Sequence, residues 1–293
     1  MISINKVSIV LPAKNEAVNL TDLLCQINAV MPDSEIVVID DGSTDNTGSM
    51  AQDAGALVYR HPYSLGNGAS IKTGARKAKG DVIVFMDADG QHDPHDIPLL
   101  LAKLDQGYDM VVGARHVSSQ SSWPRKVANS FYNWLASSMT GHRIEDLTSG
   151  FRAVKADKFR KFLYLLPNGF SYPTTSTMAF FRSGFPVAYV PIHAGKREGK
   201  SHIKVFRDGV RFFIIILRVG ALFSPMRLFL PISGSVFFTG ISHYIYNYST
   251  SGRFTNMTAL LLLSSLLIFL IGILSEQISS LHYRSAEDNR RSW

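Results

Sequence analysis

Three side chains that carry oxygen atoms follow an apolar run in the middle of the chain. The sequence VIVFMDADGQHDP, residues 82–94, places Asp87, Asp89 and Gln91 at alternate positions. Side chains two residues apart on an extended backbone point to the same side, so we expect these three to converge at the carboxyl end of a buried strand, where open α/β sheets bind ligands. Oxygen ligands suit Mg²⁺ or Mn²⁺, and a cation held there could bind a diphosphate. A solvated Asp-Gly turn is the alternative, and His92, which is out of phase with the three, is expected at the surface.

Two more polar motifs stand where other strands are predicted to end, LPAKNE at 11–16 and DDGSTD at 40–45. Asp40 or Asp41 could accept hydrogen bonds from the N–H groups of a nucleotide base, and the backbone after Pro12 could complete that contact. Taken alone, a sequence such as DGS also fits an ordinary turn.

Two common nucleotide fingerprints are absent from the sequence. GNGAS, residues 66–70, is followed by Ile71 and Lys72 and so does not complete G-x-G-x-x-G, and no G-x-x-x-x-G-K-[ST] occurs. Their absence disfavours a Rossmann dehydrogenase and a P-loop ATPase.

The elements that must position these motifs alternate along the first 115 residues. Short apolar runs rich in β-branched residues predict strands, with segments of helical length between them. These runs are 7–12, 35–40, 56–60, 81–87 and 109–113. Such alternation predicts an α/β fold with a mostly parallel sheet and helices on both faces. A helix over about 125–139, the polar stretch EDLTSGFR at 145–152 and mixed structure to about 195 should follow.

Two stretches without Asp, Glu, Lys or Arg, 228–246 and 257–275, lie near the C-terminus. Each is about as long as a helix that crosses a hydrocarbon core of roughly 30 Å, so we expect two transmembrane helices. A buried helix of a soluble protein is the alternative for the first stretch, which contains Pro231 and His243. Arginines at near-helical spacing among Phe and Ile predict an interfacial helix over 203–222, with an amphipathic core helix as the alternative.

Basic residues flank the two predicted spans unevenly. The only one between the spans is Arg253, whereas the others precede the first span or follow the second: Lys196, Arg197, Lys200, Lys204, Arg207, Arg211, Arg218, Arg227, Arg284, Arg290 and Arg291. The positive-inside rule therefore predicts a hairpin whose tip, at 247–256, is extracytoplasmic and whose two ends are cytoplasmic. The single Cys25 and the lack of a signal-peptide pattern in residues 1–12 agree with that side.

The net charge of +7 has an explanation in the same arrangement. Basic residues beside a bilayer attract anionic lipid, each by about 1 kcal/mol. The sequence has no nucleic-acid-binding motif, so membrane lipid and not nucleic acid is the expected partner. We expect an integral protein of the plasma or inner membrane, or of the endoplasmic reticulum if the source is eukaryotic.

Taken together and in order, six motifs resemble a known family: LPAKNE, VIDDGSTDNT, GNGASIKTG, MDADGQHDP, GAR and SGFR. They are similar to the cytoplasmic domain of family-two glycosyltransferases, specifically the polyprenyl-phosphate hexosyltransferase branch with dolichyl-phosphate mannose synthases and bactoprenol glucosyltransferases. The resemblance covers nearly all of residues 5–225. No Q-x-x-R-W motif follows, which argues against the processive cellulose- and hyaluronan-type synthases.

The resemblance implies a GT-A, Rossmann-like fold and a definite division of the chain. The expected parts are a cytoplasmic glycosyltransferase domain at 1–202, an amphipathic interfacial helix at 203–223, a transmembrane hairpin at 224–276 and a cytoplasmic tail at 277–293. The sequence leaves open whether the chain forms a homo-oligomer.

Roles for single residues follow from the same resemblance. Those expected around the nucleotide are Pro12, Asn15, Glu16, Asp40, Asp41, Lys72 and Asp87, with Asp41 at the base. The metal ligands would be Asp87, Asp89 and Gln91. Residues expected at the acceptor phosphate and the diphosphate are Arg115, Arg125, Asn129, Arg197 and Lys200, although some relatives carry Ser where Asn129 stands. The catalytic set would be Asp89, Arg115, Asp146 and Arg152, and Arg152, Arg197 and Lys200 would form a basic clamp on the phosphates, since guanidinium groups pair with phosphate oxygens.

The chemistry of such a transfer can be reasoned from its charges. The leaving group is a nucleoside diphosphate, whose growing charge a divalent cation and basic side chains can neutralise. A lipid monophosphate is already ionised near neutral pH, its second pKa being about 6, so it requires no base. Asp146 is the nearest base candidate, with a structural or substrate-orienting role as the alternative.

We therefore expect an inverting transferase that depends on Mg²⁺ or Mn²⁺ and acts at the cytoplasmic membrane face. It would move a hexose from a nucleotide-sugar donor, a UDP- or GDP-sugar, to a polyprenyl-phosphate or dolichyl-phosphate acceptor. Two alternatives stay open. One is a family-two enzyme whose acceptor is a hydroxyl of another lipid or a glycan. The other is a membrane scaffold without activity.

Overall fold

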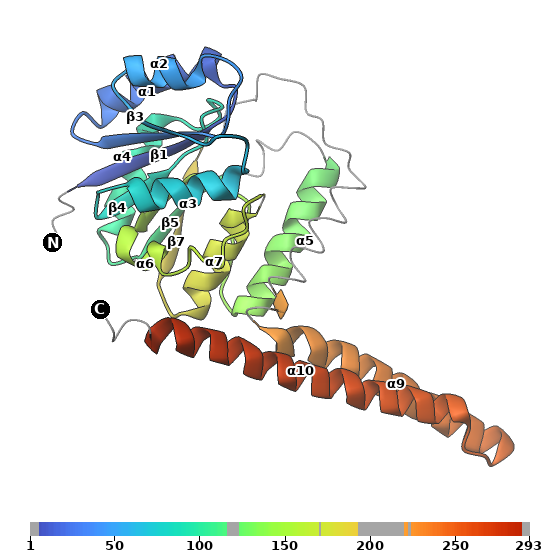
Figure 1. Ribbon diagram of the computed structural model, residues 1–293. Coiled ribbons are helices and arrows are strands. Elements are labelled where there is room, and N and C mark those ends of the chain that lie inside the picture. Colours follow the sequence, from blue (N-terminus) through green and yellow to red (C-terminus); the bar gives the residue numbers. More distant parts are fainter. Residues whose placement is uncertain (1–5, 116–122, 170, 193–219, 222–223, 289–293) are drawn as a thin grey trace. The chain divides into compact units, whose positions relative to one another are not determined.

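The computed structural model describes residues 6–115, 123–169, 171–192, 220–221 and 224–288 (Figure 1). The chain divides into two units, which are treated separately below. The first comprises residues 1–134 and 142–208, and the second comprises 135–141 and 209–293.

A seven-stranded sheet with the order β3-β2-β1-β4-β6-β5-β7 forms the centre of the first unit. Its strands are β1 (Val7–Ala13), β2 (Glu35–Asp40), β3 (Leu57–Arg60), β4 (Val82–Phe85), β5 (Met110–Arg115), β6 (Arg152–Lys155) and β7 (Val187–Ile192). Only β6 runs antiparallel to its neighbours, β4 and β5, and the other pairs are parallel. The predicted mostly parallel sheet is confirmed, and the five predicted strands match β1 to β5 closely.

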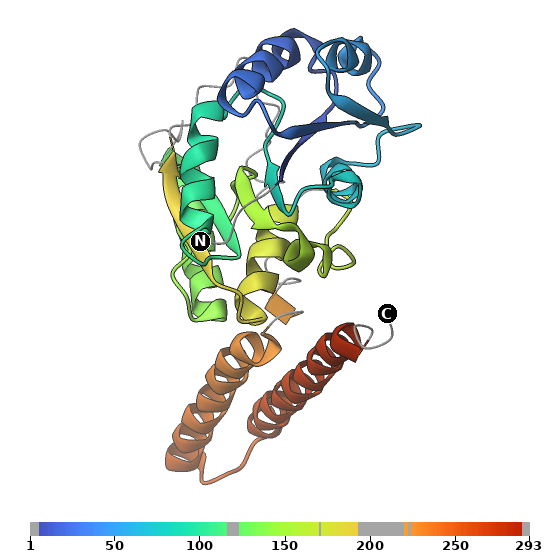
Figure 2. The same ribbon diagram turned by 90° about the vertical axis from the view of Figure 1, so that its left-hand side faces the viewer.

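Helices cover both faces of this sheet (Figures 1 and 2). They are α1 (Ala17–Val30), α2 (Thr47–Asp53), α3 (Asn67–Lys77), the short 3-10 helix η1 (Pro94–Asp96), α4 (Ile97–Leu104), α6 (Ala156–Arg160) and α7 (Tyr172–Arg182). A further helix, α5 (Trp123–Thr140), does not belong to these layers, and its residues are divided between the two units. Because side chains alternate between the faces of a strand, Ile9 and Leu11 pack with Leu24 of α1 and Leu100 of α4 in one buried cluster.

The opposite face of the sheet is packed against α3, α6 and α7. A side chain at Gly74 of α3 would lie 2.2 Å from a methyl group of Val10, so the absence of a side chain there lets α3 approach β1 closely. The Phe85 ring of β4 lies 4.7 Å from the Phe159 ring of α6 and 6.2 Å from the Tyr172 ring of α7. Both faces of the central strands β1 and β4 are thus buried, as expected for parallel strands.

The strand directions bring distant motifs to one edge of the sheet. β1 pairs in parallel with β2 and with β4, so the chain leaves all three strands at the same edge. Because β6 is reversed, its first residue enters at that edge, and Arg152 pairs with Phe85, the last residue of β4. The segments after Ala13, Asp40 and Phe85 and the segment before Arg152 therefore adjoin one another.

The second unit contains an antiparallel pair of long helices, α9 (Pro225–Ser251) and α10 (Asn256–Asp288), visible in Figure 2. Both helices are long and apolar enough to cross a membrane. Small residues hold them together. The Ser233 hydroxyl donates to the Ser265 carbonyl at 3.0 Å, and a side chain at Gly240 would lie within 3.2 Å of Leu261 and Leu262.

The helices of this unit extend beyond the predicted spans. α10 continues as one helix to Asp288, so the tail expected from residue 277 begins inside that helix. The interfacial helix expected over 203–223 lies outside the described residues except for the helical residues 220 and 221.

Candidate functional site

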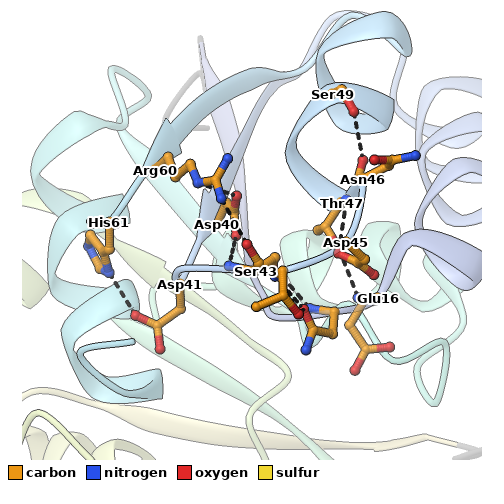
Figure 3. Close-up of polar contacts among 12 residues, drawn as sticks. Glu16, Asp40, Asp41, Ser43, Asp45, Asn46, Thr47, Ser49, Arg60 and His61 are labelled. Carbon is orange, nitrogen blue, oxygen red and sulfur yellow. Dashed lines mark hydrogen bonds and ion pairs between the residues drawn. The ribbon is translucent and has the colours of Figure 1, made fainter. Parts of the chain in front are cut away.

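Two loops at the carboxyl edge are held together by hydrogen bonds. The loop after β1 contains Asn15, whose backbone adopts φ 57°, a left-handed conformation that Asn tolerates better than most residues. Its amide N–H donates to the Ser43 hydroxyl at 3.0 Å, and its side-chain oxygen accepts from the Thr44 N–H at 2.9 Å. The Glu16 N–H donates to the Thr47 hydroxyl at 3.0 Å (Figure 3). These contacts bring Asn15 and Glu16 beside the DDGSTD turn, while Pro12 lies half-buried within β1.

Asp40, the last residue of β2, is buried and stabilises the turn that follows it. One carboxylate oxygen accepts from the Ser43 N–H at 2.8 Å, and the other lies 3.4 Å from the Arg60 guanidinium (Figure 3). The same guanidinium donates to the Ser43 carbonyl at 2.8 Å. The described contacts of Asp40 are therefore made with residues of the same loop and of the neighbouring strand β3.

The Asp41 carboxylate accepts four hydrogen bonds. The donors are the His61 ring at 2.8 Å, the Ser64 hydroxyl at 2.7 Å, the Leu65 N–H at 2.8 Å and the Gly66 N–H at 2.9 Å. Burial raises the pKa of Asp41, but these hydrogen bonds outweigh it and lower the pKa to about 2. A carboxylate offers about four lone-pair positions. The loop from His61 to Gly66 therefore uses all of them.

The glycine-rich start of α3 is closed by another loop. The Gly68 N–H donates to the Gly169 carbonyl at 3.1 Å, and the Lys72 ammonium donates to the Leu166 carbonyl at 3.2 Å and to the side-chain oxygen of Asn168. Burial lowers the pKa of Lys72. In this arrangement the start of α3 and Lys72 bind protein carbonyl groups, which differs from the nucleotide contact expected of Lys72.

The three predicted metal ligands lie on a turn and not on extended backbone. β4 ends at Phe85, and the chain turns at Gly90, whose φ is 71°. The Gln91 N–H donates to an Asp89 carboxylate oxygen at 3.2 Å. The alternation argument was therefore wrong for Asp87, Asp89 and Gln91, although the turn keeps them in one short loop at the carboxyl edge.

The chemistry of this loop fits a hard divalent cation. Asp87, with 35% of its side chain exposed, and the half-buried Asp89 and Gln91 offer oxygen donors only, which is the type that Mg²⁺ and Mn²⁺ prefer. Within the described part of the chain, no group of three His, Cys, Asp or Glu side chains forms a metal cluster. A cation at this loop would therefore be held by two carboxylates and one amide oxygen, with water and phosphate oxygens as its remaining ligands.

His92 was expected at the surface, and this expectation was wrong. The residue is 6% exposed, and its ring stacks on that of Phe151 with centroids 5.1 Å apart. Its Nε2 atom lies 3.8 Å from a carboxylate oxygen of Asp87. On an extended chain, residues 87 and 92 would point to opposite sides, so the contact between His92 and Asp87 was not predicted from the sequence.

Arg115 and Asp146 form a buried, bidentate ion pair. Nε and Nη2 of Arg115, at the end of β5, donate to the two Asp146 oxygens at 2.8 and 3.0 Å. Asp146 also accepts from the N–H groups of Thr148 and Ser149, at 3.0 and 3.1 Å. Burial raises the pKa of Asp146, and the contacts from Arg115 and the backbone outweigh it and lower the pKa. This environment supports the structural role for Asp146 over that of a base.

Arg152 is fully buried at the start of β6. Its guanidinium donates to the Ser176 hydroxyl at 2.7 Å, to the Pro173 carbonyl at 3.1 Å and to the Ser149 carbonyl. A phosphate clamp requires a guanidinium that the substrate can reach. The geometry therefore differs from the expected clamp, and Arg152 holds the turn before β6 to the start of α7.

The other predicted acceptor contacts lie outside the described residues or side chains. Arg125 and Asn129 belong to α5, but their side chains are not described, and neither Arg197 nor Lys200 is described at all.

Comparison with protein families gives two matches along the chain. The model of glycosyl transferase family 2 matches residues 8–163, and that of the GtrB C-terminal hairpin matches residues 224–281.

Two similar curated proteins are both described as undecaprenyl-phosphate 4-deoxy-4-formamido-L-arabinose transferase. The protein of Proteus mirabilis (strain HI4320) is 35% identical over 162 residues, which are 52% of this chain and 49% of that protein. The protein of Enterobacter sp. (strain 638) is 34% identical over 218 residues, 70% of this chain and 64% of that protein. The chain thus spans about half to two thirds of the length of these relatives.

Among solved structures, glucosyl-3-phosphoglycerate synthase from Mycobacterium tuberculosis has a similar fold. The crystal structure contains Mn²⁺, uridine diphosphate and phosphoglyceric acid. It matches with a TM-score of 0.61 at 20% identity, over 73% of this chain and 78% of the other. The similarity confirms the GT-A fold predicted from the sequence.

Proposed function

This chain belongs to glycosyltransferase family 2, and from that premise we propose that it transfers a hexose from a nucleotide-sugar to a polyprenyl phosphate. One observation carries the proposal: a family-2 domain and the GtrB-type hairpin occur in the same chain. The two relatives named for undecaprenyl phosphate support the acceptor class. The hairpin would keep the domain beside a membrane-bound acceptor.

The donor would lie at the edge formed by the loops after β1, β2 and β4. Asp87, Asp89 and Gln91 would hold Mg²⁺ or Mn²⁺, and the Mn²⁺ and uridine diphosphate in the Mycobacterium tuberculosis protein support this assignment. When bound, the cation would neutralise the charge that develops on the departing diphosphate. Asp40, Asn15 and Glu16 would shape the nucleotide pocket.

Asp41 would contribute to recognition of the uracil or guanine base of a UDP- or GDP-sugar, and its present hydrogen bonds restrict how it can do so. Because all four of its lone-pair positions are in use, a base N–H would take the place of a present donor. The Ser64 hydroxyl is the donor that can turn away most easily, since it rotates about one bond, whereas the Leu65 and Gly66 donors belong to the backbone.

The acceptor phosphate would attack directly, with inversion at the anomeric carbon. An ionised phosphate requires no proton removal, and the engagement of Asp146 with Arg115 agrees with a reaction that lacks a dedicated base. Arg115, with 28% of its side chain exposed, would lie toward the acceptor, together with Arg125, Asn129, Arg197 and Lys200. The catalytic domain and both termini would be cytoplasmic, as the basic flanks of the spans indicate.

The test is a transfer assay with the full-length protein in detergent. Labelled UDP- and GDP-hexoses with Mn²⁺ are offered together with polyprenyl phosphate or the corresponding free alcohol, and the label in the lipid phase is counted. We expect transfer to the phosphate only. Transfer to the alcohol would indicate a hydroxyl acceptor, and no transfer to any acceptor with every donor would favour the scaffold.

Asp89→Asn supplies the site-specific arm of this assay. Its turnover should fall by at least about 100-fold, since one electrostatic contact to developing charge is worth about 3 kcal/mol. The matched control is Asp93→Asn in the same loop. Asp93 is exposed and caps the His95 N–H at 2.9 Å, and Asn also caps helices well. Equal turnover of the two variants would contradict the assignment of Asp89.

A further inference from the structure

His92 lies in a buried slot that the proposed chemistry does not use. Its ring is stacked on Phe151 at an interplanar angle of 22°. Its Nδ1 atom is buried without a hydrogen-bond partner among the described residues, and Nε2 faces the Asp87 carboxylate at 3.8 Å. Burying a polar ring whose nitrogens make no hydrogen bond costs free energy. The contact with Asp87 is the described interaction that can offset this cost.

The surroundings of the ring favour one tautomer. A buried N–H group without an acceptor costs more than an unused lone pair, which is why orphaned donors are rare. The geometry therefore favours an N–H group at Nε2, where it faces Asp87. The 3.8 Å separation exceeds a hydrogen bond of about 2.7–3.2 Å, so the contact attracts the carboxylate without occupying one of its lone pairs.

The Asp87 carboxylate is also confined by the turn before β6. A Cβ atom at Gly150 would lie 2.8 Å from the carboxylate oxygen that faces His92, so only glycine leaves room for Asp87 there. The Tyr172 hydroxyl donates to the Gly150 carbonyl at 2.8 Å, and the buried Arg152 guanidinium donates to the Ser149 carbonyl. The backbone of Ser149 and Gly150, against which Asp87 packs, is thus held in place by α7 and β6.

We propose that His92 is a positioning residue, which holds Asp87 in the orientation that the divalent cation requires. The inference rests on the proposed function, because it assumes the cation site at Asp87, Asp89 and Gln91. Partners that orient metal ligands are typically worth 10- to 100-fold in metal affinity. His92 is not itself assigned as a ligand, because Mg²⁺ and Mn²⁺ prefer oxygen.

The experiment measures Mn²⁺ binding directly and does not depend on turnover. Free Mn²⁺ is followed by electron paramagnetic resonance during titration of the full-length protein in detergent. His92→Phe keeps a flat ring against Phe151 and removes the N–H group, and we expect its Kd for Mn²⁺ to rise about tenfold or more. The matched control is His95→Phe. The exposed His95 ring contacts Asp93 at 2.8 Å in the same loop, and its loss should change the Kd by less than about twofold.

Two further measurements separate positioning from a purely structural role. His92→Gln restores an N–H donor at a similar reach and should recover part of the lost affinity. The melting temperature of each variant is measured without cation, since a purely structural residue would lower it and leave the Kd unchanged. If His92→Phe does not fold, His92→Met takes its place in the titration.

The Mn²⁺ titrations have three possible outcomes, and each supports or overturns the inference about His92. Weaker Mn²⁺ binding by His92→Phe, with recovery in His92→Gln, supports the inference. Unchanged binding by His92→Phe, or equally weak binding by both variants, overturns the inference and leaves the proposed function intact. No Mn²⁺ binding by the wild-type protein would overturn the proposed cation site and the inference together.

Discussion

Replacing Asp41 by Asn removes the acceptor on which the loop from His61 to Gly66 depends. The variant keeps one acceptor oxygen and has an NH₂ group in place of the other. In one orientation of the amide, the NH₂ group faces the Ser64 hydroxyl and the Gly66 N–H. In the other orientation, it faces the His61 ring and the Leu65 N–H. At least one backbone N–H then loses its acceptor. An unsatisfied buried group costs about 1–3 kcal/mol, so the free energy of unfolding should fall by about 2–3 kcal/mol at pH 7.

The pKa of Asp41 gives a second measure of the same effect. Its value of about 2, against an ordinary 3.8, corresponds to about 2–3 kcal/mol at about 1.4 kcal/mol per pKa unit. Because the folded-state pKa is the lower one, this stabilisation is fully present above the ordinary pKa and is lost as the pH falls toward 2. The difference between wild type and Asp41→Asn should therefore shrink between about pH 4 and pH 2.

The assay is denaturant unfolding of the detergent-solubilised protein, followed by intrinsic fluorescence at several pH values. Asp33→Asn serves as the control, because Asp33 is exposed in the connection between α1 and β2 and should change stability by less than about 0.5 kcal/mol. A loss below about 0.5 kcal/mol for Asp41→Asn, or a loss that stays constant from pH 7 to pH 2, would refute the reasoning.

Three further predictions concern other parts of the molecule. Asp146→Asn should lower the free energy of unfolding by about 2 kcal/mol. This is less than the roughly 3–5 kcal/mol of a fully buried pair, because its guanidinium partner is 28% exposed. The kcat of the variant should stay within about tenfold of wild type, whereas loss of a general base costs about 10²–10⁴-fold. Gly150→Ala would place a methyl group 2.8 Å from an Asp87 oxygen and should weaken Mn²⁺ binding in a titration, and unchanged binding would argue against that contact. In a Cys25→Ser background, Ser251→Cys should react with an impermeant thiol reagent added outside intact cells, and protection of that cysteine would contradict the predicted topology.

The sequence predicted the sheet well because β-branched apolar runs carry a strong local signal. β2 matches its predicted range at both ends, and β1 and β3 differ by one residue at one end. β6 and β7 were not predicted, because β6 has only four residues and β7 contains Pro191. The direction of β6 depends on pairing with β4 and β5, which no short stretch of sequence reveals.

The geometry of the candidate site could not be predicted from the spacing of its residues. Asp87 and Asp89 lie at the predicted edge, but the strand ends two residues before Asp87, so the side chains are arranged by the turn at Gly90. His92 and Arg152 were misjudged for one reason. His92 packs on Phe151 and Arg152 contacts α7. In each case the partner is distant in sequence, so composition and spacing around each residue contained no sign of its burial.

The late position of β6 and α7 in the sequence also determines when the proposed cation loop can be completed during synthesis. Asp87, Asp89 and Gln91 leave the ribosome early, but Phe151, Gly150 and the Tyr172 hydroxyl, which back the loop, are added many residues later. Such contacts between distant segments form late, because closing the long intervening loop has an entropic cost. A nascent chain that stops before β6 therefore carries the three proposed ligands without the support that orients them, and the proposed cation binding should arise only once α7 has been made.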